Sequence, residues 1–198
     1  MTLDQLNKLG IDSKWLNPLQ ETFDKYEINT VQRQACFIGQ CMHESAGFKA
    51  TRENLNYSAK GLMATWPSRF PDMDTAEKYE HNPEKIASKV YLGRMGNTTP
   101  EEAGMYIGRG LIQITGKDAY KSASEALKED LLANPQLAEE PRYAALTAGW
   151  FWNRKGLNDL ADQNNYEATK EMTKRINGGV LGLDDRIAKI NMALNALS

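Results

Sequence analysis

The stretch NTVQRQACFIGQCMHESAG, residues 29–47, decides the fold class. Asn29, followed by Gln32 three residues later, resembles a capping box, which opens a helix. Gly47 is expected to lie where that helix ends. The apolar side chains between these limits are Ala35, Phe37, Ile38 and Met42. Their spacing is typical of a helix that buries one face.

The same spacing recurs outward from this stretch along most of the chain. We expect helices at residues 3–9, 12–26, 82–91, 118–128, 141–154, 166–176 and 184–197, and shorter ones that begin at Ser58 and Thr99. Two patches, residues 48–57 and 104–117, are expected to be non-helical. Three glycines within residues 108–116 disfavour a helix in the second patch. The sequence therefore predicts a mainly α protein with small non-helical patches.

Composition and charge limit the class of protein. The chain has 198 residues, of which 41% are apolar, as in globular proteins of one domain or of two lobes that share a core. A net charge of −2, without a basic block, disfavours nucleic acid as a partner. The start of the chain lacks the pattern of a signal peptide, and no apolar run is long enough for a membrane anchor. We expect a protein that is made in the cytoplasm.

The metal and redox motifs that the chain lacks narrow the chemistry further. Cys36 and Cys41 lie five residues apart on one predicted helix, so they face different directions and are expected to remain thiols. His43–Glu44 begins like a zinc-protease signature, but Gly47 stands where the second histidine belongs. We therefore expect no metal and no cofactor.

Two glutamates offer acid–base chemistry. Glu44 closes the helix of residues 29–47, where the helix dipole and apolar neighbours favour a neutral carboxyl, as a general acid requires. Its neighbour His43 is expected to hydrogen-bond the local backbone. Glu53 lies in a polar loop beside Arg52, where solvent and a cation favour a charged carboxylate. One neutral and one charged carboxyl is the arrangement that glycoside hydrolysis needs.

Four motifs in order make the chain resemble glycoside hydrolase family 19, which includes plant-type chitinases and many phage endolysins. They are His43–Glu44–Ser45–Ala46–Gly47–Phe48, Glu53–Asn54–Leu55–Asn56–Tyr57–Ser58, Gly108–Arg109–Gly110–Leu111–Ile112–Gln113–Ile114–Thr115–Gly116 and Ile176–Asn177–Gly178–Gly179. The resemblance implies a lysozyme-like, two-lobed helical fold with a central substrate cleft. It implies a single catalytic domain over residues 1–198 without a separate wall-binding domain.

The resemblance also implies roles for individual residues. Glu44 matches the general acid of an inverting mechanism, and Glu53 matches the general base of the endolysin branch. Thr115 falls where a hydroxyl holds the attacking water. The residues that match positions lining the cleft or tuning the acid are Gln113, Asn177 and Arg186. For inversion, the two carboxyl groups should lie roughly 6.5–9.5 Å apart.

Two further candidates and one departure remain open. Tyr57 either stacks on a sugar or packs in the interior. Arg109 either pairs with one of the two glutamates or braces its loop through backbone carbonyls. Leu181 stands where a polar residue is common in the family, which places the details of the substrate in doubt.

The first function hypothesis is an endolysin-type peptidoglycan hydrolase that causes lysis of the host cell. It would be a monomer that acts on the glycan strands of the periplasmic cell wall, after a membrane-permeabilising partner releases it. A chitinase acting on β-1,4-linked N-acetylglucosamine shares the chemistry and is the first alternative. A catalytically silent glycan-binding protein is the alternative from another class.

Overall fold

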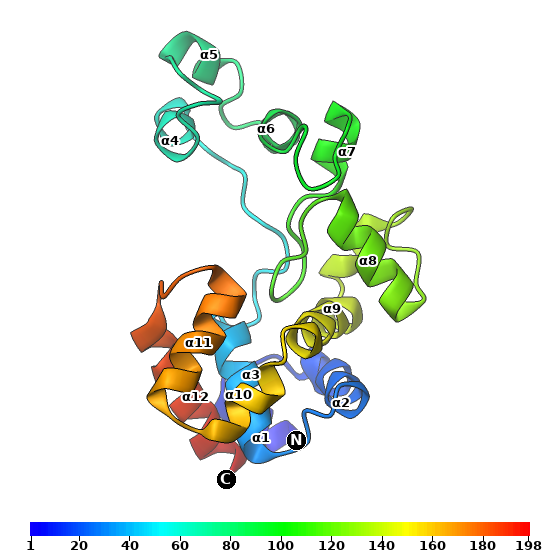
Figure 1. The fold of residues 1–198 in the computed structure, drawn as a ribbon, viewed down its shortest axis with the longest axis vertical. Coiled ribbons are helices and arrows are strands. Elements are labelled where there is room, and N and C mark those ends of the chain that lie inside the picture. The colour runs from blue at the N-terminus through cyan, green and yellow to red at the C-terminus, as the bar shows by residue number, and fades with distance from the viewer. The chain divides into compact units, whose positions relative to one another are not determined.

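The computed structural model describes residues 1–198 and divides into two compact units. Unit 1 comprises residues 1–51, 110–113 and 137–198, and unit 2 comprises residues 52–109 and 114–136. Both units are helical, and the only bridges between extended segments are two isolated pairs (Figure 1). The predicted fold class, mainly α with small non-helical patches, is confirmed. No helix combines the length and the apolar character needed to cross a bilayer.

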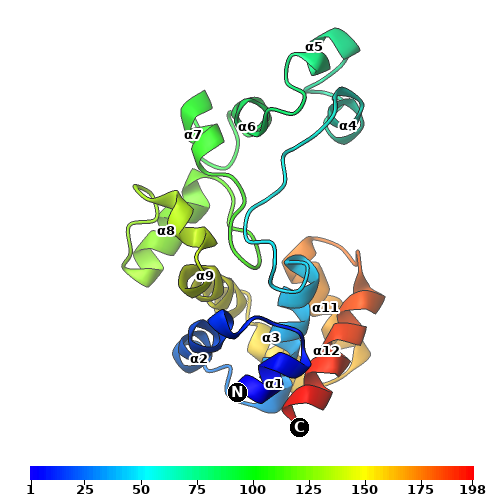
Figure 2. The same cartoon turned by 180° about the vertical axis from the view of Figure 1, so that it is seen from behind.

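Unit 1 is built around one buried helix, α3 (Val31–Glu44). Every residue of α3 from Ala35 to Met42 is buried, because other helices cover it on several sides. Figures 1 and 2 show α12 running beside α3. The other elements of unit 1 are α1 (Leu3–Lys8), η1 (Ser13–Trp15), α2 (Leu16–Lys25), α9 (Pro141–Arg154), α10 (Leu157–Gln163), α11 (Tyr166–Asn177) and α12 (Leu183–Leu197).

Close packing holds α3 against its neighbours. Phe37 is fully buried between Phe23 of α2 and Trp152 of α9, with ring centroids 5.8 and 5.3 Å away. On the α12 side, a Cβ on Gly39 would lie 2.6 Å from the backbone nitrogen of Ile190. Only a glycine lets the two backbones come this close, so Gly39 sets the distance between α3 and α12.

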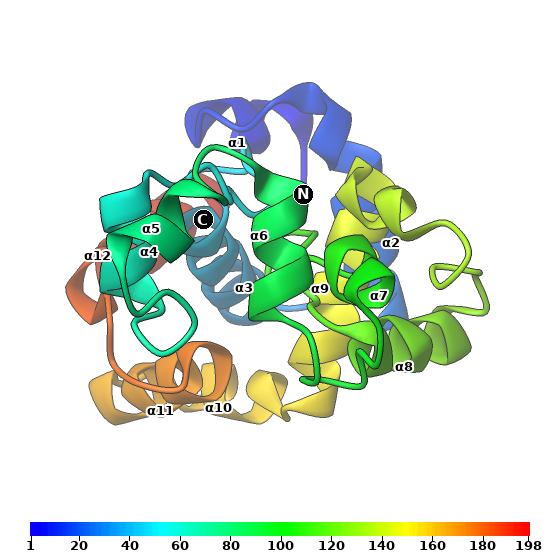
Figure 3. The same cartoon turned by 90° about the horizontal axis from the view of Figure 1, so that it is seen from above.

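Unit 2 has a smaller core of its own. Its helices are α4 (Ala59–Thr65), α5 (Met73–Glu77), α6 (Pro83–Val90), α7 (Pro100–Met105) and α8 (Lys117–Leu127). Leu62, Phe70, Ile86 and Val90 are almost completely buried in this core. Helix α6 packs against α7 (Figure 3). The 3-10 turn η2 (Pro135–Glu139) follows at the boundary of unit 2.

The two predicted non-helical patches meet inside unit 2. Arg52 forms an antiparallel bridge with Arg109, which forms a second bridge with Ile114. The backbone N–H of Glu53 donates to the carbonyl of Gly108 at 2.9 Å. The pairing therefore places Glu53 beside the glycine-rich segment.

Several local predictions need correction. Helix α3 is capped by Thr30, whose hydroxyl accepts from the Arg33 N–H at 3.1 Å, and not by Asn29. The helix closes at Glu44, as predicted, and Ala46, Gly47 and Phe48, which follow it, all have positive φ angles. The helices α5 and α10 are not among the predicted elements.

Candidate active site

Glu44, the predicted general acid, is the last residue of α3. Its Oε1 lies 2.5 Å from Nη2 of Arg186, which comes from α12 and lies 142 residues away in the sequence. The Arg186 side chain is 1% exposed and that of Glu44 is 22% exposed. The structure therefore joins two of the residues that the resemblance singled out and leaves one edge of the carboxyl open to solvent.

Arg186 is held by more than Glu44. Its Nη1 donates to Oε1 of Gln40 at 2.7 Å, and its Nε donates to the carbonyl of Leu181 at 3.0 Å. Gln40 is itself fully buried and donates to the hydroxyl of Thr173 at 3.2 Å. A guanidinium with partners on all three nitrogens has one fixed orientation. It therefore fixes the position of the Glu44 carboxyl as well.

The structure adds a cation to the helix end and the apolar neighbours that surround Glu44. Nη2 of Arg186 lies 2.5 Å from Oε1 of Glu44. The family resemblance implied that Arg186 tunes the acid, and the packing of α12 against α3 provides a direct contact between the two side chains.

His43 has a different partner from the predicted one. Its Nδ1 lies 2.6 Å from Oδ2 of Asp185, on α12, and not against the local backbone. Lys189 contacts the same carboxylate oxygen at 2.6 Å. Lys189, and next His43, lower the pKa of Asp185 below its usual value. A Cβ on Gly182 would lie 2.3 Å from the His43 ring, so α12 begins directly against this imidazole.

Glu53, the predicted general base, lies in unit 2 and has neutral donors. The backbone N–H of Gly108 donates to Oε1 at 2.7 Å, and the phenolic O–H of Tyr91 donates to Oε2 at 2.8 Å. Gly108 also accepts the N–H of Glu53, so this pair is bonded in both directions. Each carboxylate oxygen has one strong donor and keeps lone pairs that can accept a proton.

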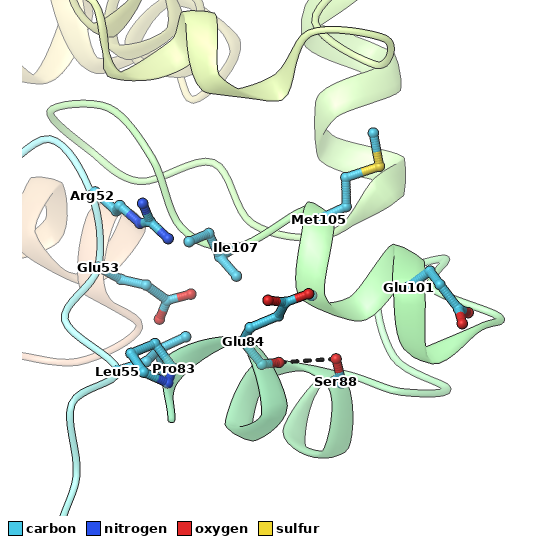
Figure 4. Close-up of a pocket in the computed structure, with 10 residues that line it drawn as sticks. Arg52, Glu53, Leu55, Pro83, Glu84, Ser88, Glu101, Met105 and Ile107 are labelled. Atoms are coloured by element: carbon cyan, nitrogen blue, oxygen red, sulfur yellow. Dashed lines mark hydrogen bonds between the residues drawn. The ribbon is translucent and has the colours of Figure 1, made fainter. Parts of the chain in front are cut away.

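A pocket with a volume of about 400 Å³ borders Glu53 in unit 2. In Figure 4, the carboxyl groups of Glu53 and Glu84 point into the pocket, while Glu101 lies at its edge. Arg52 and Ser88 also line the pocket, and its apolar side chains are Leu55, Pro83, Met105 and Ile107. A wall of mixed carboxylate and apolar character suits a sugar, which has both hydroxyls and apolar ring faces.

The remaining predicted residues occupy varied positions. Thr115 is half-buried. It directly follows Ile114, which forms a bridge with Arg109. Gln113 has a positive φ of 47° and makes a long contact of 3.5 Å to the Gly110 carbonyl. Asn177 is exposed at the end of α11. Leu181, where the family commonly has a polar residue, is 74% exposed.

The structure shows the contacts of Arg109 and Tyr57, whose roles the sequence left open. Nη1 of Arg109 donates to the carbonyl of Met105 at 2.8 Å and to the hydroxyl of Tyr120 at 2.9 Å. These are the contacts expected of a residue that braces its loop. Tyr57 packs edge-on against Trp66 with ring centroids 5.0 Å apart and is half-buried beside the unit 2 core.

Trp150, Phe151 and Trp152 form a run of three aromatic residues on α9, and they differ in burial. Only Trp152 of the run is fully buried; Trp150 and Phe151 are half-buried, since consecutive helix positions face different directions.

Both cysteines lie buried on α3 as free thiols. Burial raises the pKa of Cys36 to about 11.

Sequence reasoning missed four groups that contact the predicted residues. They are Gln40, Tyr91, the N–H of Gly108 and Asp185. Gly108 was part of a recognised motif, so its closeness to Glu53 was the most accessible of these contacts. Tyr91 lies 38 residues from Glu53 and carries no local signal of its contact.

Comparison with known proteins identifies the family. The model of the family described as class I chitinase matches residues 21–165. A glycosyl hydrolase family 19 domain-containing protein of Haemophilus influenzae is 45% identical over 163 residues, which are 80% of this chain and 76% of the relative. An endochitinase of Arabidopsis thaliana is 41% identical over 161 residues, 80% of this chain, but the match spans only 44% of that relative.

A solved structure has a similar fold. The crystal structure of chitinase C from Streptomyces griseus matches with a TM-score of 0.66 and 22% sequence identity. The match covers 99% of this chain and 76% of the other. The family model covers most of the chain, and the Haemophilus relative is similar over 80% of it. The chain therefore belongs to glycoside hydrolase family 19 and is a chitinase-like glycosidase.

Proposed function

We propose that this glycosidase is an endolysin-type peptidoglycan hydrolase that cleaves β-1,4 glycosidic bonds of the bacterial cell wall with inversion. Glu44 protonates the glycosidic oxygen and becomes a carboxylate. Glu53 takes a proton from a water on the opposite face of the sugar, and that water forms the new bond to the anomeric carbon. Thr115 orients the water by accepting a hydrogen bond from it, with no transfer of a proton to the hydroxyl.

The contrasting contacts of the two glutamates carry this proposal. Arg186 lies against Glu44 and stabilises the carboxylate that remains after the proton has left. Glu53 accepts from Gly108 and Tyr91, which orient its carboxylate and leave lone pairs that can accept a proton. The pocket beside Glu53 offers space for a sugar ring or its substituent.

The choice of peptidoglycan rests on the loop Glu53–Asn54–Leu55–Asn56–Tyr57–Ser58, which resembles the endolysin branch. We further propose that the chain acts as a monomer on the periplasmic wall after a membrane-permeabilising partner releases it from the cytoplasm of the host. A bacterial relative at 45% identity is compatible with a bacterial or phage setting.

A chitinase is the second candidate, because several similar proteins are named endochitinases. The chemistry at the cleaved bond is the same, so the substrate decides between the two. Peptidoglycan carries a lactyl ether and a peptide on alternate sugars, and chitin carries neither. Parallel assays on purified peptidoglycan and on chitin oligomers therefore separate these candidates.

The first experiment compares the wild type with Glu44→Gln and Glu53→Gln on purified Gram-negative peptidoglycan. We expect new reducing ends with the wild type and a loss of about 100- to 10,000-fold in each variant. Proton NMR at early times should show the α-anomer as the first product, because inversion of a β bond produces it. Glu77→Gln and Glu167→Gln, two exposed glutamates on α5 and α11, serve as controls and should retain activity.

The outcomes separate the hypotheses. Reducing ends from chitin alone would replace the peptidoglycan proposal with the chitinase. New amino groups without reducing ends would exclude the glycosidic mechanism on this substrate. Binding to the wall without hydrolysis of either glycan, unaffected by Glu44→Gln, would support a silent glycan-binding protein. Circular dichroism of each variant verifies that it is folded.

A further inference from the structure

Tyr91 makes a contact to Glu53 that no sequence argument foresaw. Its O–H donates to Oε2 of Glu53 at 2.8 Å, while Oε1 accepts the backbone N–H of Gly108 at 2.7 Å. All three residues belong to unit 2. Two donors on the two oxygens of one carboxylate define the plane of that carboxylate.

Tyr91 is itself held in place. It caps the end of α6, where its N–H donates to the carbonyl of Ala87 at 3.0 Å. Its own carbonyl accepts from Nδ2 of Asn97 at 3.2 Å, and its ring packs against the core of unit 2. A side chain fixed at both backbone ends and at its ring loses little freedom when it donates to a carboxylate.

The segment of residues 91–97, the Tyr91 loop, also contacts the segment that carries Thr115. Oδ1 of Asn97, a residue only 1% exposed, accepts from the N–H of Lys117 at 3.0 Å. The carbonyl of Met95 accepts from the N–H of Asp118 at 3.1 Å. A Cβ on Gly116 would lie 2.3 Å from that of Met95, so the two segments are in direct contact.

We propose that Tyr91 is a positioning residue for the general base Glu53, and that the Tyr91 loop holds this base in register with Thr115. The inference rests on the proposed function, since it assumes that Glu53 takes the proton from water. Tyr91 keeps its own proton throughout. The water's proton moves to Glu53, and the remaining hydroxide oxygen bonds to the sugar.

The chemistry of a phenol suits this role. Burial, and next the charge of Glu53, raise the pKa of Tyr91 well above its usual value, so the phenol remains a donor at every working pH. A donor favours the charged carboxylate, which a base must be before it accepts a proton. A neutral donor does so with a smaller loss of basicity than a cation, because it lacks the Coulombic attraction of a full charge.

The test is the pH dependence of Tyr91→Phe, which removes one oxygen and leaves the ring. On soluble peptidoglycan fragments, we expect kcat to fall about 10- to 100-fold, because the base loses one of the contacts that orient it. KM should change by less than about twofold, because the contact that is lost is one to Glu53. The acidic limb of kcat/KM should move up by about one pH unit, because the charged carboxylate has lost a donor.

Tyr106→Phe is the matched control. Tyr106 is also a tyrosine of unit 2, and its O–H donates to the carbonyl of Leu132 at 3.0 Å, away from Glu53. Its removal costs a similar hydrogen bond, so it reports the effect of lost stability alone. We expect an unchanged pH profile and nearly unchanged kcat. Thermal unfolding of both variants verifies that each is folded.

The outcomes distinguish this inference from the proposed function. If Glu53→Gln abolishes activity and Tyr91→Phe leaves the acidic limb in place, the positioning role is wrong and the base is not. If Glu53→Gln retains activity, the proposed function fails first. A drop in kcat that Tyr106→Phe reproduces, without a shift of the acidic limb, would also overturn the role of Tyr91.

Discussion

The surroundings of Glu44 and of Glu53 are built in opposite ways. Glu44 ends a buried helix and faces a cation, Arg186, from a second helix packed alongside. Glu53 lies in a non-helical segment and accepts from a backbone N–H and a phenol, both neutral. A full positive charge thus supports one carboxyl, and oriented dipoles support the other.

The difference reflects the different tasks proposed for the two groups. An acid becomes negative when it releases its proton, so a nearby cation stabilises it after the step. A base becomes neutral when it accepts a proton, so a cation in direct contact with its carboxylate oxygens, as Arg186 is with Glu44, would oppose the step. The contrast also predicts that the surroundings of Glu44 matter most for stability, because a buried charge without its partner is costly.

The largest effect on stability is expected for Arg186→Ala. The variant removes a buried guanidinium and leaves Gln40 and the Leu181 carbonyl without their donor. We expect the free energy of unfolding to fall by about 3–5 kcal/mol, measured by urea denaturation. Arg175→Ala is the control, because its pair with Glu171 is exposed and should contribute less than about 1 kcal/mol. Equal losses of the free energy of unfolding in the two variants would contradict the stabilising role of the buried Arg186–Glu44 pair.

A smaller loss is expected for Gly39→Ala, which tests the packing that brings Arg186 to Glu44. The new Cβ would meet the backbone of Ile190 at 2.6–2.7 Å and force α3 and α12 apart. Overpacking of this kind costs about 1–3 kcal/mol, although alanine favours a helix more than glycine does. Activity should fall with stability. A variant more stable than the wild type would show that the close approach of the two helices is not required.

The smallest effect is expected for Asp185→Asn, and it should depend on pH. Lys189 and His43 lower the pKa of Asp185, so its contribution to stability is present above the pKa of the unfolded chain and is lost as pH falls through the folded value. We expect a loss below about 1 kcal/mol at pH 7, because Asp185 is half exposed. The difference in the free energy of unfolding between the wild type and the variant should vanish near pH 2. A difference that stays the same at every pH would exclude an ionic origin of this stabilisation.

Helix ranges and caps could be predicted from the sequence where they depend on neighbouring residues. Helix α9 was predicted over its full observed range, residues 141–154, because proline stands at its start and apolar residues recur inside it. The helix starts predicted at Ser58, residue 82 and Thr99 are confirmed, because the side chains of Ser58, Asn82 and Thr99 cap α4, α6 and α7. Such a cap depends only on residues within the first turn of its helix.

The sequence by itself determined the fold class, the family and the identity of the candidate acid and base. These follow from apolar spacing and from short motifs, which are properties of neighbouring residues. Only the tertiary structure decided which groups face each carboxyl. Arg186 reaches Glu44 across 142 residues, and Tyr91 reaches Glu53 across 38. Such partners depend on how helices and loops pack, and the electrostatics of each carboxyl depend on those partners.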